Sequence, residues 1–319
     1  MKIVFIIGTG RCGSSFVHEL IAAHRDAGFI SNVEDRLRRL PFKGRYNNLL
    51  YRLSQGRFTT KGKARFAPSE AFDLIGRRAS PIYCRPARDL RADDVTPWLE
   101  QRFRAFFEER HARQGKAVFT HKYTGWSRIG FFARIFPEAR FIHVIRDGRA
   151  VANSWLHMPW WGGYAGPENW PWGVLPVRYQ QEWEAGERSF TLLAGIGWKL
   201  LMDSYEQSAR GLDESRYMTF RYEDFLAWPH ATMEACLRFA GLPWTAQFER
   251  HLARQRIRPE RGDAWRRELL PGQIAELDAS LAGKLASYRY AAAAAAGAGV
   301  GTGRQTAAGE RVARTGASG

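Results

Sequence analysis

The sequence predicts an α/β fold in which a central parallel sheet is flanked by helices. Three observations support this prediction: short apolar runs alternate with segments of helical periodicity, the first run ends in a glycine-rich loop, and a later run ends in Arg146. Alternating strands and helices build a parallel sheet with helices on both faces. Ligands of such sheets bind beyond the carboxyl ends of the strands, so the functional residues are expected at that edge.

The elements follow one another in a regular order along the chain. We expect strands at residues 3–7, 28–31, 117–121, 140–145 and 216–221. We expect helices at residues 14–24, from 97 onward, and at 127–137, 150–155, 187–209, 230–240 and 271–286. Thr96 as capping residue and Pro97 in the first turn mark the start of the helix at 97. These elements predict a single domain over residues 1–290, and the Ala- and Gly-rich stretch 291–319 is expected to be disordered.

The composition is that of a globular protein of enzyme size. The chain has 319 residues, of which 45% are hydrophobic and 25% are charged. No apolar stretch reaches the roughly 18–20 residues that span a bilayer, and the N-terminal residues lack the layout of a signal peptide, so we expect a cytoplasmic protein. Cys12, Cys84 and Cys236 lie far apart without a CxxC pair, which predicts free thiols and neither a disulfide framework nor a zinc site.

The charge of the chain indicates an anionic partner. The formal net charge is +16 and the pI is near 10.2, which is typical of proteins that bind nucleic acid or an anionic surface and also suits a small polyanionic cofactor. A basic, non-catalytic module that binds RNA or anionic polysaccharide therefore stays open. Part of the excess lies in residues 36–65, where Lys and Arg alternate with Leu, Phe and Tyr, as in a solvated helical face or a rim that binds an acceptor.

The glycine-rich loop after the first strand fits two phosphate-binding patterns. Gly8, Gly10 and Gly13 satisfy G-x-G-x-x-G, and the same stretch fits G-x-x-x-x-G followed by Ser14 and Ser15. In nucleotide triphosphatases a lysine follows the last glycine and reaches the β- and γ-phosphates. Ser14 stands at that position here, so the sequence argues against hydrolysis of ATP or GTP.

The loop still provides donors for a phosphate that carries no metal ion. Backbone N–H groups at a helix N-terminus, two hydroxyl groups and the cation Arg11 make a suitable site. Glu34 and Asp35 lie near the spacing at which a dinucleotide-binding fold places its ribose-binding acid. An NADP-dependent oxidoreductase of the Rossmann type is therefore an alternative interpretation of the loop.

A second group of residues follows the strand at 140–145. Arg146 stands at the end of this strand, and Ser154 lies eight residues further on in the next helix. A guanidinium and a hydroxyl in this arrangement can bind one phosphate together. Two separate phosphate sites imply a doubly phosphorylated ligand, although a salt bridge to Asp147 and an exposed helical serine are the ordinary roles of these residues taken singly.

With these two motifs the chain resembles the PAPS-dependent sulfotransferase family. GTGRCGSS (8–15) looks like the 5′-phosphosulfate loop of that family, and RDGRAVANS (146–154) matches its 3′-phosphate segment R-(D/N)-x-x-x-x-x-x-S. RYEDF (221–225) and RIRPERGDAWRREL (256–269) are similar to further family segments. The resemblance implies a P-loop NTPase-like sulfotransferase architecture, the cofactor 3′-phosphoadenosine-5′-phosphosulfate (PAPS) and the product 3′-phosphoadenosine-5′-phosphate (PAP).

The resemblance also implies which residues bind the cofactor. The 5′-phosphosulfate side would be held by Arg11, Cys12, Gly13, Ser14 and Ser15. The 3′-phosphate would be bound by Arg146 and Ser154, the adenine would contact Tyr222, and Arg258 in the C-terminal basic segment would be a further contact.

The implied reaction requires a base and cations but no metal ion. An acceptor hydroxyl attacks sulfur in line, a base takes its proton, and cations stabilise the charge on the departing phosphate oxygen. Glu34 and His121 are the alternative bases, and Lys122 and Arg11 would assist the departing oxygen. A helix cap and a core histidine are the ordinary roles of the two alternatives, and for His143, on a buried strand, we expect the core.

The acceptor is indicated by the tryptophan-rich segment 155–173. Its indole side chains are Trp155, Trp160, Trp161, Trp170 and Trp172. Indole rings stack on sugar rings and on apolar acceptors, which favours a carbohydrate or lipid-linked hydroxyl as the partner and a lid role for the segment, with hydrophobic packing of the loop as the alternative. With such an acceptor, no nucleic-acid partner is expected.

Overall fold

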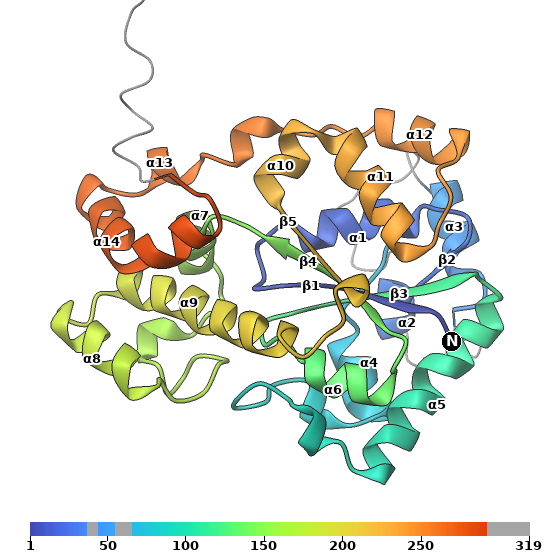
Figure 1. Cartoon of the computed structure of the whole chain (residues 1–319), viewed down its shortest axis with the longest axis horizontal. Coiled ribbons are helices and arrows are strands. Elements are labelled where there is room, and N and C mark those ends of the chain that lie inside the picture. The colour runs from blue at the N-terminus through green and yellow to red at the C-terminus, as the bar shows by residue number, and fades with distance from the viewer. Residues whose placement is uncertain (37–43, 55–65, 292–319) are drawn as a thin grey trace, which may run out of the picture.

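A parallel sheet of five strands lies at the centre of the part of the chain that the structure describes, residues 1–36, 44–54 and 66–291 (Figure 1). The structure is a computed structural model. The strands are β1 (Ile3–Gly8), β2 (Ala27–Gly28), β3 (Val118–Thr124), β4 (Arg140–Ile145) and β5 (Tyr217–Arg221). They lie in the order β2-β3-β1-β4-β5, and each neighbouring pair is parallel. The predicted fold class is confirmed.

The strand order argues against the Rossmann interpretation of the glycine-rich loop. In a Rossmann sheet β1 lies between β2 and β4. Here β1 lies between β3 and β4. The loop after β1 therefore lies beside the carboxyl ends of β3 and β4, where Lys122 and Arg146 are found.

Side chains of β1 alternate between two hydrophobic cores, one on each face of the sheet. Ile3, Phe5 and Ile7 belong to one core, whereas Val4 and Ile6 belong to the other. The Val4 face is covered by α1 (Ser14–Ala22), α10 (Tyr222–Ala227), α11 (Pro229–Ala240) and α12 (Ala246–Ala253). The Ile3 face is covered by α4 (Phe72–Arg78), α5 (Pro97–Gln114), α6 (Ile129–Ile135), α7 (Gly148–Leu156), α9 (Phe190–Ala209) and α14 (Pro271–Ser287).

Shorter elements complete the described ranges. The further helices are α2 (Asn32–Arg36), α3 (Asn47–Ser54), α8 (Val177–Ala185) and α13 (Trp265–Glu268). The 3-10 turns are η1 (Pro81–Tyr83), η2 (Ala92–Asp94), η3 (Gly163–Ala165), η4 (Glu214–Arg216) and η5 (Pro259–Arg261). Thr96 caps α5 as predicted, because its side chain accepts a hydrogen bond from the Leu99 N–H at 3.2 Å.

Several element boundaries differ from the prediction, two of them for identifiable reasons. The strand expected at 28–31 ends at Gly28, because the chain then leaves the sheet and Ser31 forms an isolated antiparallel bridge with Pro68. The helix expected from residue 187 begins at Phe190, because Glu187 and Arg188 have positive φ angles of 52° and 59°. The short helices α2, α4, α8, α10, α12 and α13 lie in segments for which the sequence predicts no helix.

Several expectations fall partly or wholly outside the described residues. These are the tail beyond Ala291 and residues 37–43 and 55–65 of the basic segment. That residues 1–290 form one domain stays a prediction. In the described ranges, no helix combines the length and apolar character needed to cross a membrane, and no cluster of three or more His, Cys, Asp or Glu side chains is arranged to hold a metal ion.

Candidate active site

The glycine loop (residues 8–13) connects β1 to the N-terminus of α1. Gly10, Arg11 and Gly13 have φ angles of 84°, 56° and 91°, so the chain turns sharply before the helix begins. The first turn of any helix leaves backbone N–H groups without intrahelical partners, and the helix dipole makes this end attractive to anions. The loop therefore has the backbone form of a phosphate site.

Tyr222 lies directly against Gly13. A Cβ atom on Gly13 would lie 2.2 Å from Tyr222 Cδ2, so this close approach requires glycine. The Tyr222 ring also lies near the Arg146 guanidinium, whose central carbon is 5.4 Å from the ring centroid. The start of α10 thus supports both the glycine loop and Arg146.

The structure brings both predicted phosphate motifs together. Arg146 Nη1 donates a hydrogen bond to the Arg11 carbonyl oxygen at 2.9 Å. Arg11 Nε donates to Ser154 Oγ at 2.8 Å. Arg146 reaches the loop from the end of β4, and Ser154 reaches it from α7. Residues far apart in the sequence therefore form one polar cluster at the carboxyl edge of the sheet.

Lys122 approaches the same loop from β3. Its register opposite Ile6 of β1 places the Lys122 side chain on the α1 side of the sheet. Lys122 Nζ donates to Ser15 Oγ at 2.7 Å and lies 3.0 Å from Glu70 Oε1. Thr124 Oγ1 donates to the same Glu70 oxygen at 2.7 Å. Glu70 was not predicted, because it belongs to no motif and reaches the site only through the fold.

Comparison with known proteins agrees with this geometry. A model of the sulfotransferase family matches residues 4–246. The chain belongs to the sulfotransferase family. The resemblance found in the sequence is thereby confirmed, and it extends over most of the described residues.

Two solved structures share the fold of this sulfotransferase. The sulfotransferase domain from the curacin biosynthetic pathway superposes with a TM-score of 0.52 at 13% identity, over 91% of this chain and 99% of that domain. Sulfotransferase STF9 from Mycobacterium avium superposes with a TM-score of 0.51 at 14% identity, over 91% of this chain and 77% of STF9. At such identities the likeness concerns the fold alone. No curated protein matches the sequence.

Cys12 and Ser14 of this sulfotransferase are buried beside the loop. The Cys12 thiol is fully buried in the core on the α1 side of the sheet, close to Gly8, so the Cys12 side chain is not available to contact a ligand. Ser14 is also buried and begins α1. Arg258 is half-buried in the segment before η5, and that turn lies against α10 through the contact of Gly262 with Glu223.

Glu34 is held in a buried ion pair on α2. Its Oε1 atom lies 2.7 Å from Arg110 Nε, and its Oε2 atom accepts a hydrogen bond from Asn47 Nδ2 at 3.2 Å. Burial raises the pKa of Glu34, an effect that the Arg110 guanidinium opposes. These contacts tie Glu34 to α5 and α3 on the β2 side of the sheet.

His121 belongs to the aromatic core. It is fully buried, its Nε2 atom lies 3.0 Å from the Tyr83 hydroxyl oxygen, and its ring packs edge-on against Phe5 and Phe107. Burial lowers the pKa of His121 to about 3, so the imidazole is neutral. Because side chains alternate along a strand, His121 and its neighbour Lys122 point to opposite faces of β3.

His143 takes the predicted core position. It is 1% exposed, stacks on Tyr205, and hydrogen-bonds through Nδ1 with the Tyr217 hydroxyl. Burial lowers its pKa to about 3 as well.

The tryptophan-rich segment is mostly packed inside the protein. Trp155, Trp161, Trp170 and Trp172 are buried, whereas Trp160 is 46% exposed. The Trp155 ring packs against the Trp172 ring at a tilt of 38°, with 4.3 Å between ring centroids. The Trp155 Nε1 atom lies 3.9 Å from the position of a Cβ on Gly10. Hydrophobic packing thus accounts for most of these rings, and Trp160, in edge contact with Trp155, is the exposed one among them.

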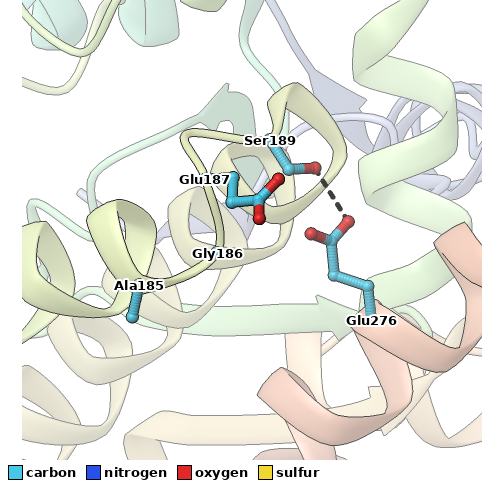
Figure 2. Close-up of a pocket in the computed structure, with 5 residues that line it drawn as sticks. All are labelled: Ala185, Gly186, Glu187, Ser189 and Glu276. Atoms are coloured by element: carbon cyan, nitrogen blue, oxygen red, sulfur yellow. Dashed lines mark hydrogen bonds between the residues drawn. The ribbon is translucent and has the colours of Figure 1, made fainter.

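A shallow pocket elsewhere on the surface does not suit a phosphorylated ligand. It is lined by Ala185, Gly186, Glu187, Ser189 and Glu276 (Figure 2). Ser189 Oγ donates to Glu276 Oε2 at 2.8 Å. Both charged lining residues are carboxylates, which repel phosphate, so the glycine loop remains the candidate active site.

Proposed function

We propose that this sulfotransferase moves the sulfuryl group of PAPS to an acceptor hydroxyl. The observation that carries the proposal is the convergence of Arg11, Arg146 and Lys122 on the glycine loop at the start of α1. Positive charges held around a helix N-terminus favour a ligand with several anionic groups. A doubly phosphorylated adenosine carrying a sulfate has such groups.

The residues of the site fit such a ligand. Arg11 and Ser154 present a guanidinium and a hydroxyl side by side, which is a suitable pair of phosphate donors. Trp155 Nε1 is a buried donor that has no hydrogen-bond partner among the described residues, and it lies beside Gly10. A buried N–H without a partner is unfavourable, so a ligand oxygen in the loop would satisfy it.

The family resemblance gives each of these residues a proposed role. PAPS, when bound, supplies a sulfuryl group joined to a phosphate oxygen. Ser14, Ser15 and the backbone of the glycine loop would hold the 5′-phosphate, while Arg146 and Ser154 would bind the 3′-phosphate. Lys122 would stabilise negative charge at the phosphate oxygen from its place beside Ser15.

We propose that Tyr222 and Arg258 flank the adenine side of the site. Tyr222 is 9% exposed and packs beneath Arg146, and the turn that follows Arg258 lies against the same helix. We further propose that the reaction needs no metal ion, because side-chain cations supply the positive charge that magnesium supplies in nucleotide triphosphatases.

The two bases expected from the sequence both have other partners. Glu34 is paired with Arg110, and His121 faces the aromatic core with a pKa lowered to about 3. A base must reach the proton of the acceptor hydroxyl at hydrogen-bond distance. These contacts argue against Glu34 and His121 as the base. The carboxylate of Glu70, which lies beside Lys122, is the alternative.

We propose a carbohydrate or lipid-linked hydroxyl as the acceptor. Trp160 is exposed and contacts Trp155, which in turn lies beside the glycine loop. An exposed indole at this place offers a flat surface for a sugar ring. A cytoplasmic location is part of the same proposal.

Calorimetric titration with PAP, ATP–magnesium and NADPH tests the donor assignment. We expect wild-type protein to bind PAP but neither ATP–magnesium nor NADPH. We expect Arg146→Ala to lose about 2–5 kcal/mol of PAP binding free energy, because a charged partner of a bound phosphate is removed. Arg238→Ala is the matched control, since Arg238 lies exposed on α11 and pairs with Glu234 one helical turn away. Incubation of PAPS with a panel of glycosides, glycolipids, sterols and phenols, followed by mass spectrometry, tests the acceptor class.

Other outcomes of the same titrations would refute the proposal. Magnesium-dependent binding of ATP would indicate a nucleotide triphosphatase, and binding of NADPH without PAP would indicate an oxidoreductase. Salt-sensitive binding of RNA or heparin, with no stoichiometric PAP site, would indicate a polyanion-binding module.

A further inference from the structure

We propose that Glu70 is the catalytic base that accepts the proton of the acceptor hydroxyl. The proposal rests on the sulfuryl transfer proposed above and names a residue of the same site. Glu70 Oε1 accepts a hydrogen bond from Thr124 Oγ1 at 2.7 Å and lies 3.0 Å from Lys122 Nζ. A carboxylate thus lies beside the cation that contacts the first turn of α1.

The fold brings Glu70 to this place through a short pairing outside the sheet. The Asn32 N–H donates to the Ala67 carbonyl at 2.8 Å, and the Ser69 N–H donates to the Ile30 carbonyl at 2.8 Å. The residues before Glu70 are therefore fixed against the segment that follows β2. The Tyr83 hydroxyl also donates to the Glu70 carbonyl oxygen at 3.4 Å.

The backbone immediately after Glu70 is strained. Ala71 has φ 51° and ψ 33°, a left-handed conformation that is unfavourable for a residue with a Cβ atom. Ala71 is 1% exposed, and its backbone N–H donates a hydrogen bond to Ser69 Oγ at 3.1 Å. Strain of this kind persists where the surrounding structure enforces it, and it is concentrated at functional sites.

The position of Glu70 suits an acceptor that arrives from solvent. The carboxylate is linked to Ser15 Oγ through Lys122, by an ion pair of 3.0 Å and a hydrogen bond of 2.7 Å. Its other neighbour, Thr124, borders Gly10 of the glycine loop, because Thr124 Cβ lies 3.7 Å from the position of a Cβ on Gly10. Both polar contacts use Oε1, and among the described residues Oε2 accepts no hydrogen bond. The side chain is 25% exposed, in contrast to Glu34 at 8%.

The proposed step balances with the groups present. The acceptor oxygen forms a bond to sulfur while its proton passes to Glu70 Oε2. The bond between sulfur and the bridging phosphate oxygen breaks, and its electron pair stays on that oxygen, beside Lys122. The products are the sulfated acceptor and PAP, and Glu70 then releases its proton to solvent.

Glu70→Gln separates the chemical role from a structural one. PAP release from PAPS would be followed with water as acceptor and with the hydroxyl compounds of the panel, and PAP affinity would be measured by calorimetry. We expect turnover to fall by roughly 100-fold or more, the size of a lost general base. PAP affinity should equal or exceed that of wild type, since a carboxylate that competes for Lys122 has been removed. Glu214→Gln, on the exposed turn η4, is the matched control and should leave both quantities unchanged.

Glu70→Ala with added formate provides the second measurement. A small external carboxylate should restore part of the lost turnover if Glu70 accepts a proton, whereas it would restore nothing if Glu70 only positions Lys122. Turnover of Glu70→Gln within threefold of wild type would overturn the proposal. So would PAP binding weakened more than tenfold together with normal turnover at saturating PAPS.

Failure of the underlying function has a different signature. In that case wild-type protein neither binds PAP nor releases it from PAPS, before any variant is considered. A wild type that does both, together with a fully active Glu70→Gln, refutes the role of Glu70 alone.

Discussion

Replacement of Glu34 by Gln decides whether this carboxylate is a structural partner of Arg110 or a catalytic base. The two side chains are 8% and 7% exposed, and Glu34 Oε1 lies 2.7 Å from Arg110 Nε. Removing one partner of a buried ion pair leaves the other charge uncompensated and destabilises a protein by about 3–5 kcal/mol. We expect Glu34→Gln to lower the free energy of unfolding by about 3 kcal/mol, the lower end of this range. The loss is at the lower end because glutamine keeps an oxygen that can accept hydrogen bonds from Arg110 and Asn47.

The double variant Glu34→Leu/Arg110→Met should recover most of this loss. Burial raises the pKa of Glu34 and lowers that of Arg110, so for each group the removal of water outweighs the attraction of its partner. A pair of this kind contributes little net stability, and apolar residues of similar volume often replace it without loss. We therefore expect the double variant to be more stable than Glu34→Gln.

Urea unfolding at pH 7 measures these changes through the midpoint and the slope of the transition. PAPS turnover of each variant would be normalised to its folded fraction. We expect the normalised turnover of Glu34→Gln to stay within a few-fold of wild type. If Glu34→Gln has the same urea midpoint as wild type but has lost turnover, the structural role is refuted and Glu34 is identified as the base.

Two further predictions concern the glycine loop and the buried histidines. Gly13→Ala should weaken PAP binding more than tenfold in calorimetry, because the new Cβ would lie 2.2 Å from the Tyr222 ring at a φ of +91°, whereas Gly272→Ala, with nothing within 4 Å, should bind normally. Stability should fall as pH drops below 6.5, because His121 and His143 have folded-state pKa values of about 3 and the unfolded chain takes up their protons first. Each histidine contributes about 2 kcal/mol of this loss between pH 6.5 and 5. Urea unfolding at both pH values should therefore show a smaller loss of stability for His121→Gln than for wild type. An equal loss in both proteins would contradict a neutral, buried His121.

The sequence predicts those parts of the fold whose signals are local. An apolar run predicts β1, and a second apolar run that ends in Arg146 predicts β4. A capped helix start predicts α5. β2 is less predictable because its length depends on the pairing of Ser31 with Pro68, a contact between distant residues. The start of α9 depends on the left-handed backbone at Glu187 and Arg188, for which these two residue types provide no local signal.

The residues of the candidate site also differ in how far local sequence signals predict them. Arg146 and Ser154 could be found because their motif is contiguous in the sequence, and the structure places both at Arg11. His121 and Lys122 are neighbours in one strand, so the sequence alone could not decide which faces the loop; the pairing of Lys122 with Ile6 of β1 decides it.

The order of the strands explains why the sequence could predict Arg146 at the glycine loop but could not predict Glu70. Because β1 lies between β3 and β4, the side chains that reach the glycine loop come from the ends of these two strands and from segments that cross that edge. A G-x-G-x-x-G pattern is compatible with more than one sheet order, so it could not by itself distinguish a Rossmann site from this one. Glu70 enters from an irregular segment that is fixed by two backbone hydrogen bonds to residues 30–32. A carboxylate that arrives in this way leaves no spacing signature, and its role therefore becomes visible only when Lys122, Thr124 and Ser15 are seen around one point of the fold.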